Sequence, residues 1–318
     1  MTIAFVVTVA VLLGLLLFLL NELRHPVRGS GSQWSKRLRV TLAVILLLVG
    51  GLVGWAFFIE PNRLVTHYET IQIDQLPPGL SNLKIAVLSD IHAGASFIDE
   101  AKLHLIVERT NDLHPDLIVI LGDFMVGTRR TSHRIEPEVF APILKELRAP
   151  LGVFAVLGNH DWWYNGPRVR RALEANSIIV LDNELTQINS RGGPFFLVGL
   201  ADLWEGNQHI AETVAKIPEG QPIIALTHNP DIFPQLPQRV MLLLAAHTHG
   251  GQVRFPLIGS VVQSSKYGER YVAGHVFENG HHLFVTTGIG TSIVPVRFGV
   301  PPEIVLLTLK SLPQVANT

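Results

Sequence analysis

Residues 83–92 have the sequence LKIAVLSDIH, an apolar run that ends in a carboxylate and an imidazole. A short run rich in aliphatic residues, here 83–88, is typical of a strand that is buried on both faces of a sheet. In extended backbone, positions i and i+2 point to the same side, so Asp90 and His92 would face one side together. The sequence therefore predicts a buried strand with two candidate metal ligands at its carboxyl end.

Predicted strands and helices alternate along the rest of the chain. Further apolar runs predicted as buried strands are 117–121, 153–157, 222–226 and 240–245. Segments with the helical spacing of apolar residues are 100–111, 137–147, 167–175 and 209–215. Runs typical of antiparallel strands are 195–200, 268–276, 282–287 and 303–309. We expect an α/β sandwich around two mixed sheets, with the site beyond the carboxyl ends of the strands.

Polar residues follow several of these strands. They are Gly122-Asp123, Gly158-Asn159-His160-Asp161, Thr227-His228-Asn229 and His247-Thr248-His249. Together with Asp90 and His92, these segments contain five of the 14 histidines. Carboxylate oxygens, an amide oxygen and imidazole nitrogens suit Zn, Fe, Mn or similar ions. Because a carboxylate can bridge two cations, we expect Asp123 to be a shared ligand.

The order of these motifs resembles the calcineurin-like metallophosphoesterase superfamily. The resemblance covers about residues 83–310, and the segments 295–298 and 301–304 are similar to the membrane-associated bacterial branch. It implies a four-layer α/β/β/α sandwich of two mixed sheets. It also implies a metal-dependent phosphoric ester hydrolase, a phosphodiesterase or phosphatase, with two divalent ions whose identity the ligands do not define.

The resemblance also assigns roles to residues. The ligands implied for the first metal are Asp90, His92, Asp123 and His249. Those implied for the second metal are Asp123, Asn159, His228 and His247. Asp123 and His160 would be the catalytic residues, with His160 contacting the phosphate and assisting the leaving group.

Two positions depart from the family pattern. Many members have an aspartate that orients the catalytic histidine where this chain has Val126. Asp161 or a distant carboxylate would then orient His160, or His160 would act mainly as a hydrogen-bond donor to the phosphate. Ala246 replaces the usual glycine before His247, a small change that we expect to be tolerated.

The expected chemistry is direct hydrolysis. Two cations about 3.5–4 Å apart polarise the phosphoryl oxygens and hold a bridging hydroxide in line with the scissile bond. A metal lowers the pKa of bound water from about 15.7 towards about 7, so no protein base is required. No covalent intermediate is expected, and a chiral thiophosphate substrate would show inversion at phosphorus. The alternative is a non-catalytic membrane receptor or scaffold that binds phosphorylated ligands in a metal-containing cleft.

Two uncharged stretches near the N-terminus, at about 3–20 and 40–59, explain the high apolar content of 47%. Each is close to the roughly 20 residues that cross a bilayer core. We expect a two-helix transmembrane hairpin over residues 1–59. A cleaved signal peptide is the competing interpretation of the first stretch, but no basic segment precedes it and no small-residue cleavage pattern ends it.

The loop between the two stretches, residues 21–39, is basic. It carries Arg24, Arg28, Lys36, Arg37 and Arg39 against Glu22. Basic loops stay in the cytoplasm, which would place the rest of the chain in the periplasm or outside the cell. The predicted location is therefore the bacterial inner membrane, with a multi-pass anchor and an exported catalytic domain.

The remaining chain divides into a polar tether at 60–82, the catalytic domain at 83–310 and a tail at 311–318. A formal net charge of −1 argues against nucleic acid as a partner. The expected partners are the lipid bilayer and a phosphorylated small molecule or lipid, and a lipid-linked phosphodiester or pyrophosphate is favoured by the anchor. The segment Trp162-Trp163-Tyr164 could line a lipid pocket, contact the bilayer or simply pack in the core. The oligomeric state is not predicted.

Overall fold

The computed structural model describes residues 33–74, 76–127 and 134–311, together with Gly14, Leu17 and Asn21. The chain divides into two compact units, Met1–Ile59 and Glu60–Thr318. In the first unit, α2 (Gln33–Gly54) continues into the π-helical η1 (Trp55–Ile59). The helical segment Arg37–Asn62 contains an 18-residue stretch with a mean hydropathy of 2.7 and is long enough to cross a membrane. The other predicted span, 3–20, lies outside the described residues apart from Gly14 and Leu17.

The second unit contains a first six-stranded sheet. Its strands, in spatial order, are β1 (Val65–Ile73), β14 (Glu303–Ser311), β2 (Lys84–Leu88), β3 (Leu117–Ile120), β4 (Val153–Ala155) and β5 (Ile179–Val180). All neighbouring pairs are parallel except β14 with β2, which are antiparallel. The sheet is therefore mixed, and the carboxyl ends of β2, β3 and β4 meet at one edge.

A second six-stranded sheet is also mixed. Its order is β12 (Gly274–Glu278), β13 (His281–Val285), β9 (Leu242–Ala245), β8 (Ile223–Leu226), β7 (Gly193–Gly199) and β6 (Glu184–Ser190). The four central strands are parallel to one another, and the two outer pairs are antiparallel hairpins. The carboxyl ends of β8 and β9 therefore lie at the same edge of this sheet.

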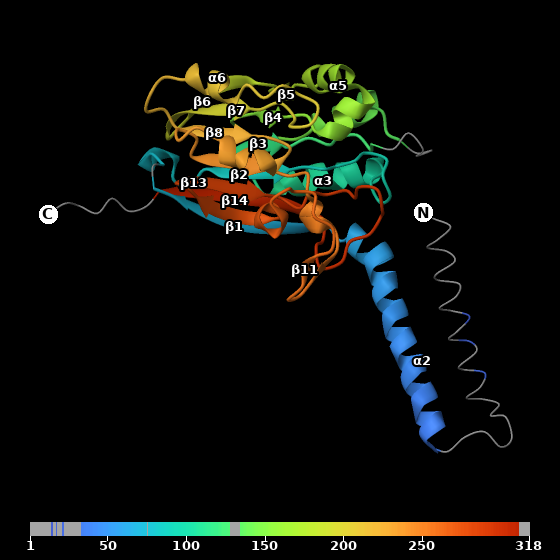
Figure 1. Ribbon diagram of the computed structural model, residues 1–318. Coiled ribbons are helices and arrows are strands. Elements are labelled where there is room, and N and C mark those ends of the chain that lie inside the picture. Colours follow the sequence, from blue (N-terminus) through green and yellow to red (C-terminus); the bar gives the residue numbers. More distant parts are fainter. Residues whose placement is uncertain are drawn as a thin grey trace. The chain divides into compact units, whose positions relative to one another are not determined.

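The two sheets face each other, with helices on both outer faces (Figure 1). The helices on the first sheet are α3 (Glu100–Asp112), α4 (Pro137–Leu144) and α5 (Asn159–Glu174). Those on the second sheet are α6 (Ile210–Ala215) and the 3-10 helix η4 (Pro230–Gln235). This arrangement confirms the predicted α/β/β/α sandwich.

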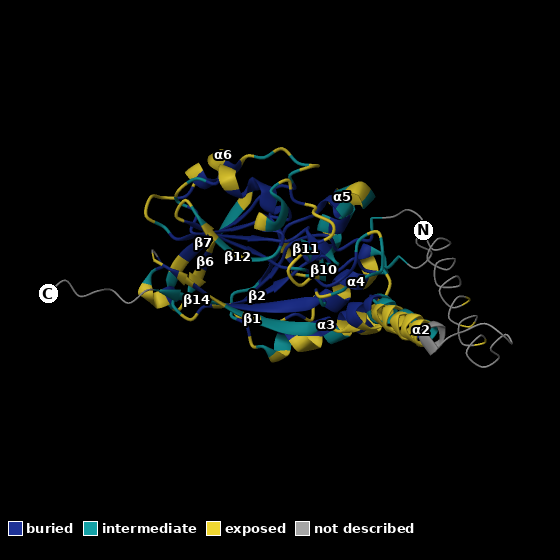
Figure 2. Ribbon diagram, turned by 60° about the horizontal axis from the view of Figure 1, so that its bottom comes forward, coloured by how far each residue is buried: buried dark blue, intermediate teal, exposed yellow. Residues whose placement is uncertain are grey.

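Alternating side chains of β2 explain why its sequence is apolar after the exposed Lys84 at its start. Ile85 and Val87 point into the core between the sheets, whereas Ala86 and Leu88 face the helices. All four side chains are buried, as are most residues of the central strands (Figure 2). A strand covered on both faces needs no polar residues in its interior. The polar residues Ser89 and Asp90 therefore come only after the strand has left the sheet.

The structure corrects three predictions. Residues 60–82 are not a simple tether, because Val65–Ile73 form the edge strand β1, which looks polar in sequence since only Ile71 and Ile73 are buried. The predicted strand 268–276 begins as the 3-10 helix η6 (Gly268–Tyr271) and becomes a strand only at β12. The predicted helix 167–175 is the second part of α5, after a kink at Asn165.

Candidate metal centre

The site residues lie where strands leave the sheets, in unusual backbone conformations. Asp90, His92, Asp123, His247 and His249 have φ values of 51°, 49°, 55°, 71° and 51°. Few residues other than glycine occupy this left-handed region, and such strain gathers at functional sites. The extended backbone assumed in the sequence argument for Asp90 and His92 is therefore wrong. The two side chains nevertheless reach one cluster.

That cluster consists of overlapping groups of ligand atoms. The groups are Asp90, His92 and His249; His92, Asp123 and His160; and Asp90, Asp123 and His228. Within each group the candidate atoms lie within 4.8 Å of one another. The groups overlap, because each pair of groups shares one residue. Asp123, for example, belongs to the group that contains His160 and to the group that contains His228.

Short distances connect the members of these groups. His249 Nε2 lies 3.2 Å from Asp90 Oδ1 and 3.2 Å from His92 Nε2. On the other side, His228 Nε2 lies 3.3 Å from Asp123 Oδ2. These nitrogen and oxygen atoms all point to the same small volume, which is the geometry of a site for cations.

Asn159 and His247 complete the cluster. His247 Nδ1 lies 3.2 Å from His228 Nε2, and Asn159 is the first residue of α5, directly after Gly158. In the described part of the chain, Asn159 Oδ1, His247 Nε2 and Asp90 Oδ1 are buried without a hydrogen-bond partner. Buried polar atoms almost always have partners, so the orphaned oxygens of Asn159 and Asp90 fit ligands of a bound cation.

Burial keeps three imidazoles neutral. It lowers the pKa of His92 to about 4 and that of His247 to about 3, and it lowers the pKa of His249 strongly. A neutral imidazole has a free lone pair, which a metal ligand needs. Burial would lower the pKa of His228 as well, but the nearby Asp123 carboxylate raises it to about 10.

The two carboxylates of the cluster, Asp90 and Asp123, have pKa values shifted in opposite directions. Burial raises the pKa of Asp90 to about 6. Burial would also raise the pKa of Asp123, but His228 and His160 hold it well below its usual range. Asp123 therefore keeps its negative charge to lower pH than Asp90 does.

Backbone carbonyls orient two of the imidazoles. His92 Nδ1 lies 2.9 Å from the Met125 carbonyl oxygen, and His228 Nδ1 lies 2.7 Å from that of Leu121. In each ring Nδ1 must be the protonated nitrogen, because a carbonyl only accepts. In His92, which is neutral, the Nε2 lone pair is then directed into the cluster, as is usual for histidines that bind metals. In His228, whose pKa is raised, Nε2 would lose its proton when a metal binds there.

Asp161 does not orient His160. Its carboxylate accepts hydrogen bonds from the backbone N–H groups of Asp123, Met125 and Gly158, at 2.9, 2.9 and 3.0 Å. It therefore fixes the turn that carries Asp123 to the start of α5. The sequence-based suggestion that Asp161 replaces the aspartate missing at Val126 is wrong.

His160 is held mainly by packing. Its ring lies 4.8 Å from the rings of both His92 and Trp163, and its backbone N–H donates to Asp123 Oδ1 at 2.9 Å. A Cβ added at Gly127 would meet His160 Nδ1 at 2.0 Å, so this glycine leaves the space that the ring occupies. His160 Nε2 lies 4.0 Å from Asp123 Oδ2, at the edge of the cluster.

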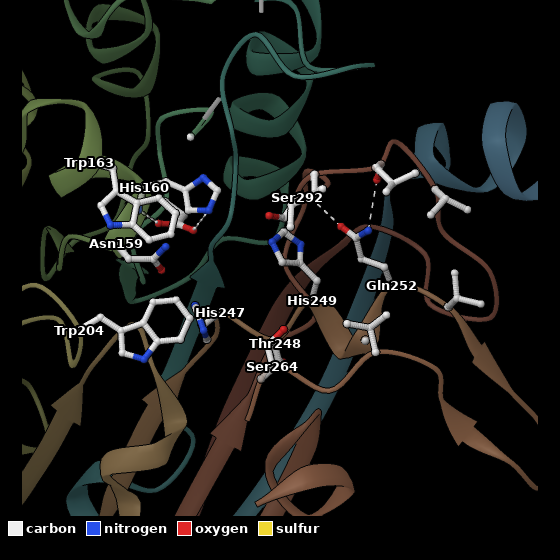
Figure 3. Close-up of a pocket in the computed structure, with 18 residues that line it drawn as sticks. Asn159, His160, Trp163, Trp204, His247, Thr248, His249, Gln252, Ser264 and Ser292 are labelled. Carbon is white, nitrogen blue, oxygen red and sulfur yellow. Dashed lines mark hydrogen bonds and ion pairs between the residues drawn. The ribbon is translucent and has the colours of Figure 1, made fainter. Parts of the chain in front are cut away.

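A cavity of about 450 Å³ opens beside the cluster. Trp163 and Trp204 lie on the side of His160, and Gln252 lies on the opposite side, beyond His249 and Ser292 (Figure 3). Trp204 packs edge-on against His247, with ring centroids 4.5 Å apart. Sequence reasoning missed Trp204, whose only signal was an aromatic residue in a polar loop after β7.

Arg297 is a further residue to which sequence reasoning gave no role at the site. Its side chain is fully buried and donates hydrogen bonds to the carbonyl oxygens of Thr287, Gly288, Gly290 and Val300. One guanidinium nitrogen also lies 3.5 Å from His249 Nδ1. Arg297 thus fixes the loop after β13, which forms one wall of the cavity.

Known proteins share this sequence pattern. A family model described as calcineurin-like phosphoesterase matches residues 83–251. The chain is 32% identical to the uncharacterized metallophosphoesterase YkuE of Bacillus subtilis, over 89% of this chain and 98% of the relative. It is 29% identical to the phosphodiesterase YaeI of Escherichia coli, over 86% of this chain and 97% of the relative.

A third relative is a bovine transmembrane protein with a metallophosphoesterase domain. It is 30% identical, over 90% of this chain and 66% of the relative. The family match and these relatives define a class of metal-dependent phosphoester hydrolases. This chain belongs to the calcineurin-like phosphoesterase family, and the part of it that the structure describes includes a helix that is apolar and long enough to cross a membrane.

Proposed function

We propose that the protein is a membrane-anchored phosphohydrolase with two metal ions that cleaves the phosphodiester or pyrophosphate bond of a lipid-linked substrate. One observation carries the proposal. Ligand atoms from separate strand ends of both sheets lie within 4.8 Å of one another in groups that share Asp90, His92 and Asp123. A single ion would not need so many ligand atoms.

We assign the ligands to the two ions by their contacts. Asp90, His92 and His249 form one group of neighbouring ligand atoms, His247 contacts His228, and Asn159 lines the cavity with Asp123 and His247. The proposed ligands of the first ion are Asp90, His92, Asp123 and His249. Those of the second ion are Asp123, Asn159, His228 and His247. Mixed oxygen and nitrogen sets of this kind suit Mn, Zn or Fe.

The residues around the ions perform the remaining steps. Bound divalent ions supply Lewis acidity and lower the pKa of a coordinated water. Burial lowers the pKa of His160, so its ring is neutral near pH 7. A neutral ring protonated at Nε2, the nitrogen that faces Asp123, donates a hydrogen bond to a phosphate or leaving-group oxygen held between them.

Two features favour a lipid-linked substrate. Part of the cavity wall is aliphatic and aromatic, with Trp163, Trp204, Val253, Val294 and Val296 among the lining residues. A helix able to cross a membrane lies in the same chain. Apolar walls beside a polar cluster suit a molecule that has a phosphate head and an acyl or prenyl tail.

We also propose that the anchor is a multi-pass hairpin in a bacterial inner membrane and that the catalytic unit faces the periplasm or exterior. Support comes from the basic loop at 21–39 and the uncharged stretch at 3–20. A periplasmic or exterior site would exclude cytoplasmic nucleotide sugars as substrates.

Hydrolysis of bis-p-nitrophenyl phosphate by the detergent-solubilised full chain tests the proposal. We expect sustained release that requires added divalent metal and falls at least about a hundredfold in Asp123→Asn and in His228→Ala. Asp116→Asn and His104→Ala, on half-buried and exposed residues outside the site, are the matched controls. No release from wild type with any metal, on this ester or on lipid phosphodiesters, would favour the receptor or scaffold instead.

A further inference from the structure

A short hairpin carries exposed apolar side chains next to the cavity. Its strands are β10 (Arg254–Phe255) and β11 (Gly259–Ser260), and it projects from the sandwich (Figure 1). We define the apolar rim as the exposed side chains of this hairpin, the residues after it and the loop after β13. Its members are Phe255, Leu257, Ile258, Val261, Val262 and Ile293.

The apolar rim is unusually exposed. Leu257 is 107% exposed, Ile258 78% and Ile293 77%. Scattered apolar side chains on a surface are ordinary, but a contiguous group of them marks a site of interaction. Each large aliphatic side chain left in water forgoes about 1.5–3 kcal/mol of burial free energy.

Backbone conformation holds two of these side chains outward. Leu257 has a φ of 69° and Ile293 a φ of 63°. A β-branched residue such as Ile293 rarely adopts this conformation, which costs roughly 1–2 kcal/mol. A surface that is both strained and exposed to water requires another source of stabilisation, and contact with an apolar phase supplies one.

The apolar rim is continuous with the cavity. Val262 and Ile293 belong to both, and Val253, Val294 and Val296 continue the apolar wall inward. This wall ends at Ser292 and His249, next to the ligand cluster (Figure 3). These apolar side chains give an acyl chain contacts from the hairpin into the cavity that holds the ligand cluster.

The charge pattern favours a lipid bilayer as the partner that covers the apolar rim. Residues 255–265 contain no charged side chain, and the nearest charges on either side are the cations Arg254 and Lys266. Arg254 pairs with Glu269 at 3.1 Å, and Lys266 lies 5.0 Å from the centre of the Tyr267 ring. Because Glu269 neutralises Arg254, the hairpin carries an uncharged apolar tip followed by the cation Lys266, which matches a bilayer interface with anionic headgroups. The chain also carries its own candidate span, so a bilayer is always within reach.

We propose that the apolar rim inserts into the membrane surface and lets a lipid-linked phosphoester pass from the bilayer into the cavity. The substrate part of this inference rests on the proposed function. Insertion itself rests on the exposed hairpin, the loop at Ile293, their charge pattern and the candidate span, and not on the proposed function. The two parts can therefore be tested separately.

The first test measures insertion. The chain has no cysteine, so Leu257→Cys and Ile258→Cys can each carry a single environment-sensitive fluorophore. Phe277→Cys, at a 56% exposed position on β12, is the matched control. In full chain reconstituted into phosphatidylethanolamine and phosphatidylglycerol vesicles, we expect blue-shifted emission and quenching by spin-labelled lipid at 257 and 258, but not at 277.

Two outcomes of this test would overturn the proposal. One is emission at 257 and 258 that matches the water-exposed control at 277. The other is blue-shifted emission that spin-labelled lipid does not quench, which would show that protein, such as a second copy of the chain, covers the apolar rim.

The second test measures access of substrate. In the double variant Leu257→Asp with Ile258→Asp, neither of which lines the cavity, we expect unchanged turnover of bis-p-nitrophenyl phosphate. Turnover of a phosphodiester lipid in vesicles should fall at least about tenfold, whereas Phe277→Asp should leave both rates unchanged. Equal lipid turnover by variant and wild type contradicts the route through the apolar rim. Lack of turnover on every ester by wild type would refute the proposed function instead, and the fluorescence test would still decide insertion.

Discussion

His160 lacks the carboxylate partner that its role would suggest, and its position depends on shape. Its ring is fixed by His92, Trp163 and the space above Gly127, while Asp161 binds only backbone N–H groups. A ring held by packing can be displaced by a single methyl group without loss of any ligand in the cluster. A substitution can therefore move the His160 ring and leave metal binding unchanged.

Gly127→Ala tests this separation. The added methyl would occupy the position of His160 Nδ1 and push the ring away from the substrate. We expect turnover of bis-p-nitrophenyl phosphate to fall roughly a hundredfold, because a displacement of about 1 Å has this effect in other enzymes. Metal content by mass spectrometry should stay at the wild-type level. Gly54→Ala, where the new methyl would meet no atom, is the control, and wild-type turnover in Gly127→Ala would refute the packing account.

Asp161→Asn should act on stability. Three backbone N–H groups donate to the Asp161 carboxylate. The asparagine amide group would point its own N–H towards at least one of them, so two donors would face each other. A buried backbone donor left without its acceptor should lower the free energy of unfolding by about 1–3 kcal/mol. Denaturant titration followed by tryptophan fluorescence measures this. Asp116→Asn affects one hydrogen bond at the surface and should lower the free energy of unfolding less. Equal losses in the two variants would contradict the structural role assigned to Asp161.

At the scale of elements, β1 is tied to the first sheet by a histidine and a glutamate as well as by its backbone. His67 Nδ1 lies 3.0 Å from Glu303 Oε2, next to the β1–β14 ladder. The hydrogen bond to Glu303 raises the pKa of His67 above 6.5, although burial opposes the shift. Because the pKa of His67 is higher in the folded state than in the unfolded state, its protonation stabilises the fold when the pH lies below the unfolded-state pKa. This contribution disappears as the pH rises through the folded-state pKa.

His67→Gln should therefore be more destabilising at pH 6 than at pH 9. The difference in the free energy of unfolding should be below about 1 kcal/mol, because the His67 side chain is 38% exposed and the pair is screened by solvent. Denaturant titrations at the two pH values measure it. His104→Gln, on an exposed histidine 3.9 Å from Glu146, is the control. A larger loss at pH 9 would reverse the sign of the argument.

The sequence predicted the central strands and the polar residues at their ends, since both follow from burial of short apolar runs. It could not predict β1, which has one solvated face, or the hairpin β10–β11, which is two residues long on each side. It also missed the left-handed backbone at Asp90 and His92. Their N–H groups donate to the carbonyl oxygens of Gly122 and Asp123, contacts that exist only once β2 and β3 are paired.

At the scale of the whole molecule, the position of the catalytic unit relative to the membrane decides which substrates it meets. A reporter fused after Thr318 tests the proposed topology. An alkaline phosphatase fusion, active only after export, should be active, and a fluorescent protein that folds only in the cytoplasm should be dark. The reverse pattern would place the site in the cytoplasm and remove the argument against nucleotide sugars.

The central claim is that Asp123 lies between two cations. Anomalous scattering from a crystal of the full chain grown with Mn²⁺ tests it most directly. We predict two anomalous peaks on either side of the Asp123 carboxylate, one beside His92 and His249 and the other beside His228 and His247. A single peak, or peaks away from these residues, would contradict the account.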